Sequence, residues 1–200
     1  MSAATALAAL RAATHAAHGR LEALPATRRL MADDYTLPEY TRLLARFAAI
    51  YGHLEPLMQA SEEAACIGYQ ARMPHLARAL AALGERATGP DLGGVANAAW
   101  AGIPRGVDAP GLQTAAARWG CLYVVEGSML GGQLIRKHLQ GLFPTLPAAA
   151  FASFVPYDNP GQQWHGMRLH LEQALLEGAP RQQALNAALA TYQLFYDGLQ

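Results

Sequence analysis

Cysteine is scarce in this sequence, and no long uncharged apolar run occurs in it. Two cysteines, Cys66 and Cys121, occur among its 200 residues, and they form neither a CxxC motif nor a disulfide framework. The N-terminal segment is apolar only periodically and carries basic and imidazole side chains from Arg11 to Arg20, unlike the core of a signal peptide. No other segment has the length of apolar residues that a membrane span needs. We therefore expect a soluble, cytoplasmic protein with reduced thiols.

The chain also has no net formal charge at pH 7. The 15 lysines and arginines balance the 15 aspartates and glutamates. Because no basic excess is present to attract phosphate backbones or anionic lipid, we expect neither nucleic acid nor a membrane as a partner. A hydrophobic content of 52% is enough for one sizeable core, and no linker or internal repeat divides the chain. We expect a single domain over residues 1–200.

Alternating β-branched residues, the pattern of strands, are rare as well. The sequence is rich in alanine and leucine, and its apolar residues recur at intervals of three and four, which predicts an all-α fold. The first predicted helix covers about residues 3–24 and is closed by Pro25. The second begins at Thr36, which forms the pattern of a capping box with Glu39, and Pro56 is expected to end or kink it.

Further helices follow from the same periodicity and from glycine and proline boundaries. They cover about residues 74–83, 112–139, 161–176 and 181–199, with a shorter element near 95–101. The segments ATGPDLGG and IPRGVDAPG are expected to be loops, and LFPTLPAAAF a connection without regular structure.

The first segment with chemical potential is HAAHGRLE in the N-terminal helix. His15 and His18 stand three residues apart, so they occupy neighbouring positions of one helical face and could share a metal. At about 100° per residue, Arg11 and Glu22 lie within about 40° of His18, whereas His15 lies about 60° to one side. His18 is therefore predicted at the centre of the inward stripe.

Two neighbours of His18 on the helix would help it to bind a metal-containing ligand. Glu22, one turn further on, can accept a hydrogen bond from the second imidazole nitrogen, which orients a ligating histidine. Arg11 lies about 10 Å earlier along the axis, a separation that fits a flat ligand with its metal at His18 and an anionic edge at Arg11. A histidine on an apolar stripe is also common as a core or boundary residue, and that alternative stays open.

The second such segment is EGSMLGGQ in the long helix. Gly120, Gly127 and Gly131 project within about 40° of one another and leave a strip without side chains. Either another helix packs its backbone against that strip, or a flat ligand lies directly on the main chain. The consecutive Gly131 and Gly132 point in different directions, which favours a soft spot where the helix passes over a ligand.

Together these segments resemble a known family. LRAATHAAHGRLEAL from residue 10, followed by LYVVEGSMLGGQLI from residue 122, resembles the haem oxygenase family in its bacterial, biliverdin-producing branch. The resemblance extends to YTRLLARFAAIYGHLEPL and ALATYQLF and covers most of the chain. It implies a single all-α domain with haem sandwiched between a proximal and a distal helix. It also implies a monooxygenase that uses O₂ and electrons from a ferredoxin or reductase to release biliverdin, CO and ferrous iron, with a biliverdin acceptor as a further partner.

The resemblance assigns roles on the proximal helix. His18 matches the haem-iron ligand, and Glu22 matches the carboxylate that hydrogen-bonds it. Arg11 matches a basic residue that can pair with a haem propionate. His15 occupies a second such position, where a lysine is often found.

On the distal helix, Gly127, Gly131 and Gly132 match the glycines that let the backbone approach the haem. Ser128 stands where animal members carry an aspartate that organises distal water, and the EGS variant resembles that of bacterial members. Its part in proton delivery is left open. Arg136 follows the glycines and could face a propionate or a reductase, with a solvated helix face as the alternative.

Two other functions remain possible from the residues. One is a haem-binding or haem-sensing protein on the same fold without turnover, and the other is a di-iron oxidase or thiaminase-like relative. Candidate di-iron ligands exist, but no ExxH motif occurs where such sites need it: His53, Glu55, Glu62 and Glu63. A mixed cluster on a late helix is assigned to core and surface roles: Trp164, His165, Arg168 and His170.

Overall fold

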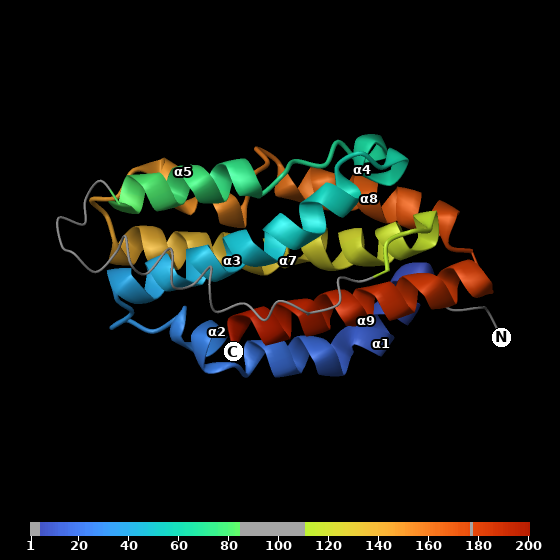
Figure 1. The fold of residues 1–200 in the computed structure, drawn as a ribbon, viewed down its shortest axis with the longest axis horizontal. Helices are drawn as coiled ribbons and strands as arrows, with labels where there is room; N and C mark the ends of the chain where they lie inside the picture. Colours follow the sequence, from blue (N-terminus) through green and yellow to red (C-terminus); the bar gives the residue numbers. More distant parts are fainter. Residues whose placement is uncertain (1–4, 85–110, 177) are drawn as a thin grey trace.

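The computed structural model describes residues 5–84, 111–176 and 178–200, and every regular element within these ranges is helical. The predicted all-α fold is thereby confirmed (Figure 1). The elements are α1 (Ala6–Glu22), α2 (Pro25–Arg29), α3 (Leu37–Met58), α4 (Glu62–Cys66), α5 (Met73–Gly84), α7 (Ala115–Leu142), the 3₁₀ helix η1 (Ala148–Phe154), α8 (Pro160–Ala174) and α9 (Ala179–Leu199).

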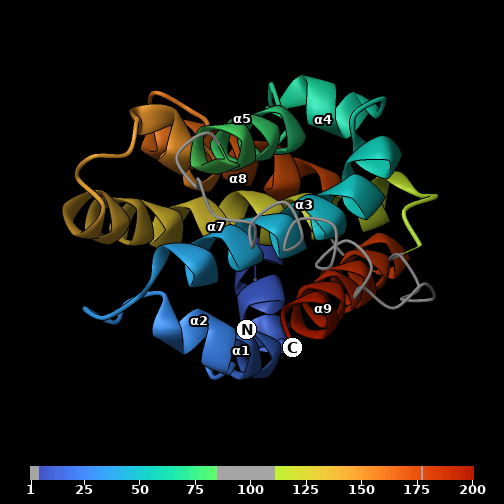
Figure 2. The same cartoon turned by 60° about the vertical axis from the view of Figure 1, so that its left-hand side comes forward.

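The helices lie in three layers. In both Figure 1 and Figure 2, α3 and α7 run through the middle, α4, α5 and α8 lie on one side, and α1, α2 and α9 lie on the other. Apolar residues of these helices meet in one buried cluster, which includes Leu10, Leu44, Leu122 and Ala188. Each buried leucine contributes about 1.5–3 kcal/mol, so burial of these stripes holds the layers together.

Local sequence signals set several helix boundaries. The Thr36 hydroxyl accepts from the backbone N–H of Glu39, and the Glu39 carboxylate accepts from the N–H of Thr36 at 2.8 Å. The predicted capping box is therefore present. Pro56 was expected to end or kink this helix; it lies inside α3, which ends two residues later at Met58.

The predicted first helix requires a correction at its end. The helix α1 ends at Glu22, and Pro25 begins the separate helix α2 rather than only closing α1. Proline is favoured in the first turn of a helix, where its missing N–H has no helical partner to lose. The change of direction between the two helices places α2 at one end of the cavity described below.

Two short elements were not predicted. The helix α4 begins after Ser61, whose hydroxyl accepts from the backbone N–H of Ala64 at 3.2 Å. The segment expected to be an irregular connection contains η1. The predicted element at 95–101 and the two predicted loops fall largely within residues 85–110, outside the described part of the chain.

Contacts with distant residues explain η1. The phenol of Tyr40 in α3 donates to the carbonyl oxygen of Ala150 at 2.6 Å. Its ring stacks with Phe143, Phe151 and Phe154 at centroid distances of 6.0–6.3 Å. Because this packing comes from α3, the sequence of the connection alone does not reveal it.

The N-terminus of α1 is held by α8. The carboxylate of Glu172 accepts from the N–H groups of Ala6 and Leu7 at 2.7 and 2.9 Å. These groups have no partner within their own helix, and a negative charge there also complements the helix dipole. The contact fixes the position of α1 relative to α8.

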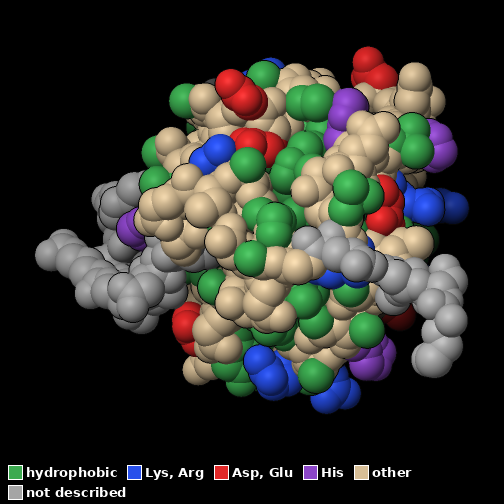
Figure 3. Space-filling view, turned by 90° about the vertical axis from the view of Figure 1, so that its right-hand side faces the viewer, with side chains coloured by type: hydrophobic (Ala, Val, Ile, Leu, Met, Phe, Trp, Pro, Cys, Tyr) green, Lys and Arg blue, Asp and Glu red, His purple; other side chains and the backbone are tan. Residues whose placement is uncertain are grey.

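The surface reflects the balanced composition. Figure 3 shows the end of the bundle at the right of Figure 1, where acidic, basic and histidine side chains are interspersed with apolar ones. Among the helices of the described residues, none combines the length and apolar character required to cross a lipid bilayer.

Candidate functional site

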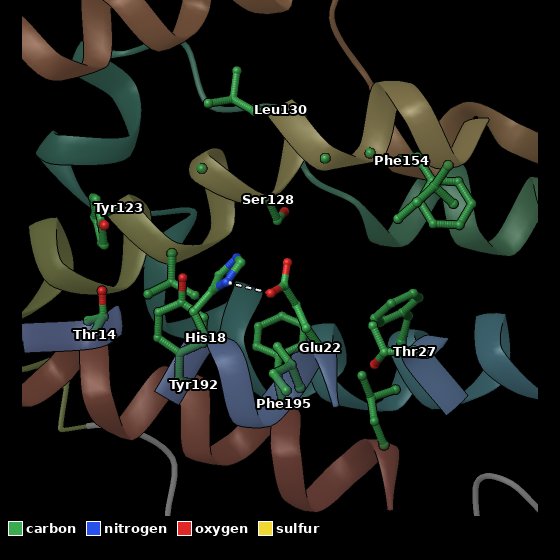
Figure 4. Close-up of a pocket in the computed structure, with 18 of the residues that line it drawn as sticks. Thr14, His18, Glu22, Thr27, Tyr123, Ser128, Leu130, Phe154, Tyr192 and Phe195 are labelled. Atoms are coloured by element: carbon green, nitrogen blue, oxygen red, sulfur yellow. Dashed lines mark ion pairs between the residues drawn. The ribbon is translucent and has the colours of Figure 1, made fainter. Parts of the chain in front are cut away.

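A cavity of about 690 Å³ lies between α1 and α7 and extends to α2, α3, α8 and α9. This volume is within the range of about 300–1,000 Å³ that is typical of cofactor and small-molecule sites. Most of its wall is apolar, and Tyr192 and Phe195 of α9 form part of it beside α1 (Figure 4).

His18 and Glu22 form the polar centre of the α1 wall. The Nδ1 atom of His18 lies 3.4 Å from Oε2 of Glu22, and the side chains are 52% and 65% exposed. The ring of Tyr192 meets the imidazole edge-on at a centroid distance of 5.8 Å. With Nδ1 directed at the carboxylate, Nε2 is the nitrogen left to bind a metal.

The predicted position of His18 on α1 requires a correction. The buried residues of this helix are Ala6, Leu10, Thr14 and Ala17, so the packed stripe runs beside His18 rather than through it. That stripe faces α8 and α9. The neighbouring face, which carries His18, lines the cavity instead.

The other candidate residues of α1 also reach the cavity. Arg11 and His15 are exposed and both line it. Within the described ranges, no three or more histidine, cysteine, aspartate or glutamate side chains come close enough to share a metal ion. The α1 wall thus offers two imidazoles, of which that of His18 has a carboxylate partner, together with the guanidinium of Arg11.

The acids considered for a di-iron centre have other partners. Glu55 accepts from the phenol of Tyr69 at 3.0 Å and from the backbone N–H of Met73 at 3.2 Å. Glu63 pairs with Arg118 at 2.5 Å. Both carboxylates therefore serve the protein framework.

The glycines of α7 fall into two groups. A methyl group on Gly131 would meet no atom within 4 Å, and this glycine faces the cavity. A methyl group on Gly132 would lie 2.6 Å from the carbonyl oxygen of Phe154, and one on Gly120 would overlap the backbone of Ala184 in α9. Close helix packing accounts for Gly120 and also for Gly132, whereas Gly131 leaves open space beside the cavity. That a flat ligand lies on the main chain at Gly131 stays a prediction.

Gly127 has an intermediate position. A methyl group there would make ordinary contact with the indole of Trp164 in α8, at 3.5 Å. Trp164 itself lines the cavity. A methyl group would therefore fit at Gly127, which borders Trp164 at the cavity wall.

Ser128 lies across the cavity from His18 and Glu22 (Figure 4). Its Oγ donates to the carbonyl oxygen of Val125 at 2.7 Å. The nearby Tyr51 of α3 also lines the cavity, and burial raises the pKa of its phenol to about 12, although a hydrogen bond with Ser128 acts in the opposite direction. At neutral pH the Tyr51 phenol is therefore protonated and able to donate, whereas the Ser128 hydroxyl gives its one hydrogen to Val125 and can still accept.

A buried ion pair holds α7 just before this serine. Nη2 of Arg72 lies 2.8 Å from Oε1 of Glu126, and the side chains are 1% and 0% exposed. Tyr69 and Tyr157 flank the guanidinium at 5.5 and 5.4 Å from their ring centroids. Burial lowers the pKa of Arg72, but Glu126 and the tyrosines outweigh this and raise it above its usual value. Because Glu126 precedes Gly127, the pair fixes the backbone at the glycine segment.

Several residues that line the cavity were not predicted from the sequence, and the predicted site residue Arg136 does not line it. Tyr51 and Arg168 line the cavity from α3 and α8. The spacing of Trp164 and Arg168, four apart on one helix, is the signal that could have found the latter. Arg136 is half-buried, and it is its neighbour Ile135 that lines the cavity.

The sequence of the chain matches the family model described as "Heme oxygenase" over residues 4–200. The chain belongs to the haem oxygenase family. The predicted resemblance is confirmed by this match. A heme oxygenase of Xanthomonas campestris pv. campestris (strain 8004) is 39% identical over 87 residues, which are 44% of this chain. The match spans about half, 52%, of that relative.

Solved haem oxygenase structures share the fold. The enzyme from Leptospira interrogans superposes with a TM-score of 0.71 at 16% identity and covers 98% of both chains. Heme oxygenase-1 from the cyanobacterium Synechocystis sp. PCC6803, solved in complex with heme, gives a TM-score of 0.69 at 15% identity over 98% of this chain and 91% of that one. At these identities the similarity supports the helical fold.

Proposed function

We propose that this protein is a haem oxygenase that binds haem between α1 and α7 and converts it to biliverdin, CO and ferrous iron. O₂ and electrons from a ferredoxin or reductase would be its co-substrates. The observation that carries the proposal is the His18–Glu22 pair on one wall of the cavity, opposite Ser128 and the open face of Gly131.

The residues present fit haem. His18 offers Nε2 to iron, while Glu22 accepts from Nδ1, which fixes the tautomer and raises the basicity of the ligand. Gly131 leaves space where any side chain would project into the cavity. The apolar wall suits a porphyrin ring, and haem would supply both the iron at which O₂ is activated and the ring that is oxidised.

Three basic side chains would hold the propionates. Arg11 and His15 line the cavity from α1, and Arg168 lines it from α8. The two arginines are charged at any physiological pH and can bind a carboxylate bidentately, whereas a histidine such as His15 is a weaker partner for an anion. We infer that Arg11 and Arg168 contribute more than His15 to the orientation of the substrate.

Ser128 and Tyr51 would deliver protons from the α7 side. The Tyr51 phenol stays protonated at neutral pH and can donate a hydrogen bond, and the Ser128 oxygen can accept one. Between them they can orient a water molecule. A hydroxyl in such a chain gives its own proton onward and takes up a proton from that water in return. Glu126 and Arg72 keep the backbone that carries Ser128 in place.

Turnover tests the proposal. The purified protein is titrated with hemin, and the Soret band is followed; ascorbate or a ferredoxin–reductase pair is then added under air. Conversion to a biliverdin spectrum with release of CO supports the proposal. A stable haem complex without turnover favours a haem-binding or haem-sensing protein, and failure to bind hemin contradicts the assignment of the cavity.

A further inference from the structure

Glu172 of α8 binds the first turn of α1, the helix that carries His18. Its Oε2 and Oε1 atoms accept from the backbone N–H groups of Ala6 and Leu7 at 2.7 and 2.9 Å. The first turn of a helix has no internal partner for these donors, so the contact satisfies both of them. One carboxylate therefore joins α8 to the start of α1.

The carboxylate is charged when it makes this contact. Burial raises the pKa of Glu172, but the hydrogen bonds from Leu7 and Ala6 outweigh it and lower the pKa below its usual value. A negative charge at the start of a helix also complements the helix dipole. At neutral pH the two hydrogen bonds are thus charge-assisted, and they are stronger than bonds between neutral groups.

Two arginines of the cavity wall stand one helical turn from this contact. Arg168 precedes Glu172 by four residues on α8, and Arg11 follows Leu7 by four residues on α1. Residues four apart lie on the same face of a helix, about 6 Å apart along its axis. Leu7, Arg11 and Arg168 all line the cavity, so the contact lies at its edge.

Both arginines lie on the same side of the contact. In Figure 1, α1 begins and α8 ends at the right-hand end of the bundle, so the two helices run in opposite directions. One turn forward along α1 and one turn back along α8 therefore lead the same way from Glu172. Arg11 and Arg168 thus come from two helices that are joined one turn away from each of them.

A fixed spacing matters for such a pair of cations. Arg11 and Arg168 are both exposed, and long exposed side chains are free to change rotamer. A ligand that binds both must bear the free-energy cost of ordering them, and this cost is smaller when their helices are already held in register. The contact of Glu172 supplies that register.

We propose that Glu172 is a positioning residue that holds Arg11 and Arg168 in register as one clamp for the carboxylate edge of a porphyrin. It acts through the arginines and does not touch the substrate. The inference rests on the proposed function, because it takes haem as the occupant of the cavity. Its consequence is selectivity for porphyrins that carry carboxylates over porphyrins that carry none.

The test compares two ligands of the full chain: hemin, which carries propionates, and iron(III) etioporphyrin, which carries no carboxylate. Glu172→Ala should weaken hemin binding by about threefold to tenfold, because the arginines are no longer held in register. Binding of iron(III) etioporphyrin should stay at the wild-type level. Absorbance titrations measure both affinities. An equal loss for both ligands, or no loss for either, would overturn the proposal.

The matched control removes a helix cap elsewhere. The Ser61 hydroxyl accepts from the N–H of Ala64 at the start of α4, and Ser61 does not line the cavity. Ser61→Ala should lower stability as the loss of a cap does and leave both affinities unchanged. A selective loss of hemin binding in this control would overturn the proposal. Glu172→Gln keeps one acceptor oxygen and should show the same selective loss if the alanine variant does not fold.

A second measurement asks whether Glu172 acts through the arginines. In a variant with both Arg11→Ala and Arg168→Ala, adding Glu172→Ala should leave the hemin affinity unchanged. A further loss as large as in the wild-type background would overturn the positioning role. Failure of the wild type to bind hemin would overturn the proposed function and this inference with it. Hemin binding that does not depend selectively on Glu172 would overturn this inference alone.

Discussion

Nδ1 of His18 lies 3.4 Å from Oε2 of Glu22, one turn further along α1, on the face of that helix that lines the cavity. This contact supports the proposal that His18 binds the haem iron. The carboxylate holds the imidazole proton on Nδ1 and leaves Nε2 directed away from α1.

Loss of the Glu22 carboxylate should weaken haem binding or turnover. We expect about a tenfold loss in Glu22→Ala, the lower end of the range for partners of metal ligands, because Glu22 is well exposed. Hemin titration and the rate of biliverdin formation measure it. Arg20→Ala, an exposed change on the same helix, is the control and should behave as wild type. Equal losses in both variants would argue against a specific role for Glu22.

Two adjacent glycines should respond in opposite ways to the same substitution. Gly131→Ala should keep or raise the stability of the apoprotein, by up to about 1 kcal/mol, because the methyl group meets open space and alanine favours a helix. It should nevertheless lower hemin affinity, because the methyl group enters the cavity.

Gly132→Ala should destabilise the fold by about 1–3 kcal/mol, because its methyl group would lie 2.6 Å from the carbonyl oxygen of Phe154. Urea unfolding and hemin titration of both variants separate the two effects. The assignment fails if Gly132→Ala is as stable as Gly131→Ala.

Replacing one partner of the buried Arg72–Glu126 ion pair should destabilise the fold more than replacing both. Glu126→Met and Arg72→Met should each destabilise the protein by about 3–5 kcal/mol, because each leaves an unpaired buried charge. The double variant should be destabilised by clearly less than the sum of the two. A double-mutant cycle in urea measures this coupling, and additive losses would show that the charges act independently.

Glu172 should make the anchoring of α1 dependent on pH. Burial raises the pKa of Glu172, but hydrogen bonds from Leu7 and Ala6 outweigh it and lower the pKa below the usual 4.5. Because the folded pKa lies below the unfolded one, the carboxylate stabilises the fold above about pH 4.5, and this stabilisation is lost as pH falls through the folded pKa.

Urea unfolding of Glu172→Gln checks this dependence. The variant should be less stable than wild type by about 1 kcal/mol at pH 7, as expected for the loss of a helix cap, and the difference should shrink towards pH 3. Asp33→Asn, which alters an exposed carboxylate, is the control. A difference that stays constant with pH would show that the charge of Glu172 does not carry the effect.

The sequence predicted those features that depend on local chemistry. The capping box of Thr36 and Glu39 and the contact of His18 with Glu22 involve residues within one turn of each other, so spacing alone reveals them. The contacts of the glycines could not be predicted from spacing along the chain. Which neighbour each one meets depends on Phe154, Trp164 and Ala184, which reach α7 only through the tertiary fold.

The same reason accounts for the missed residues. Arg168 and Tyr51 lie on different helices and meet the α1 wall only after the helices pack. The position of His18 beside the packed stripe of α1 also depends on how α8 and α9 cover that helix. Periodicity identifies an apolar face, but the packing partners decide which edge of it borders a cavity.

The central claim is that His18 binds the haem iron, and the Fe–His stretching band of the ferrous haem complex tests it most directly. Resonance Raman spectra should show this band in the wild type and in His15→Ala, and the band should be lost in His18→Ala. Added imidazole should restore an Fe–imidazole band to His18→Ala by filling the vacated space. Retention of the native band in His18→Ala, or its loss in His15→Ala alone, would contradict the account.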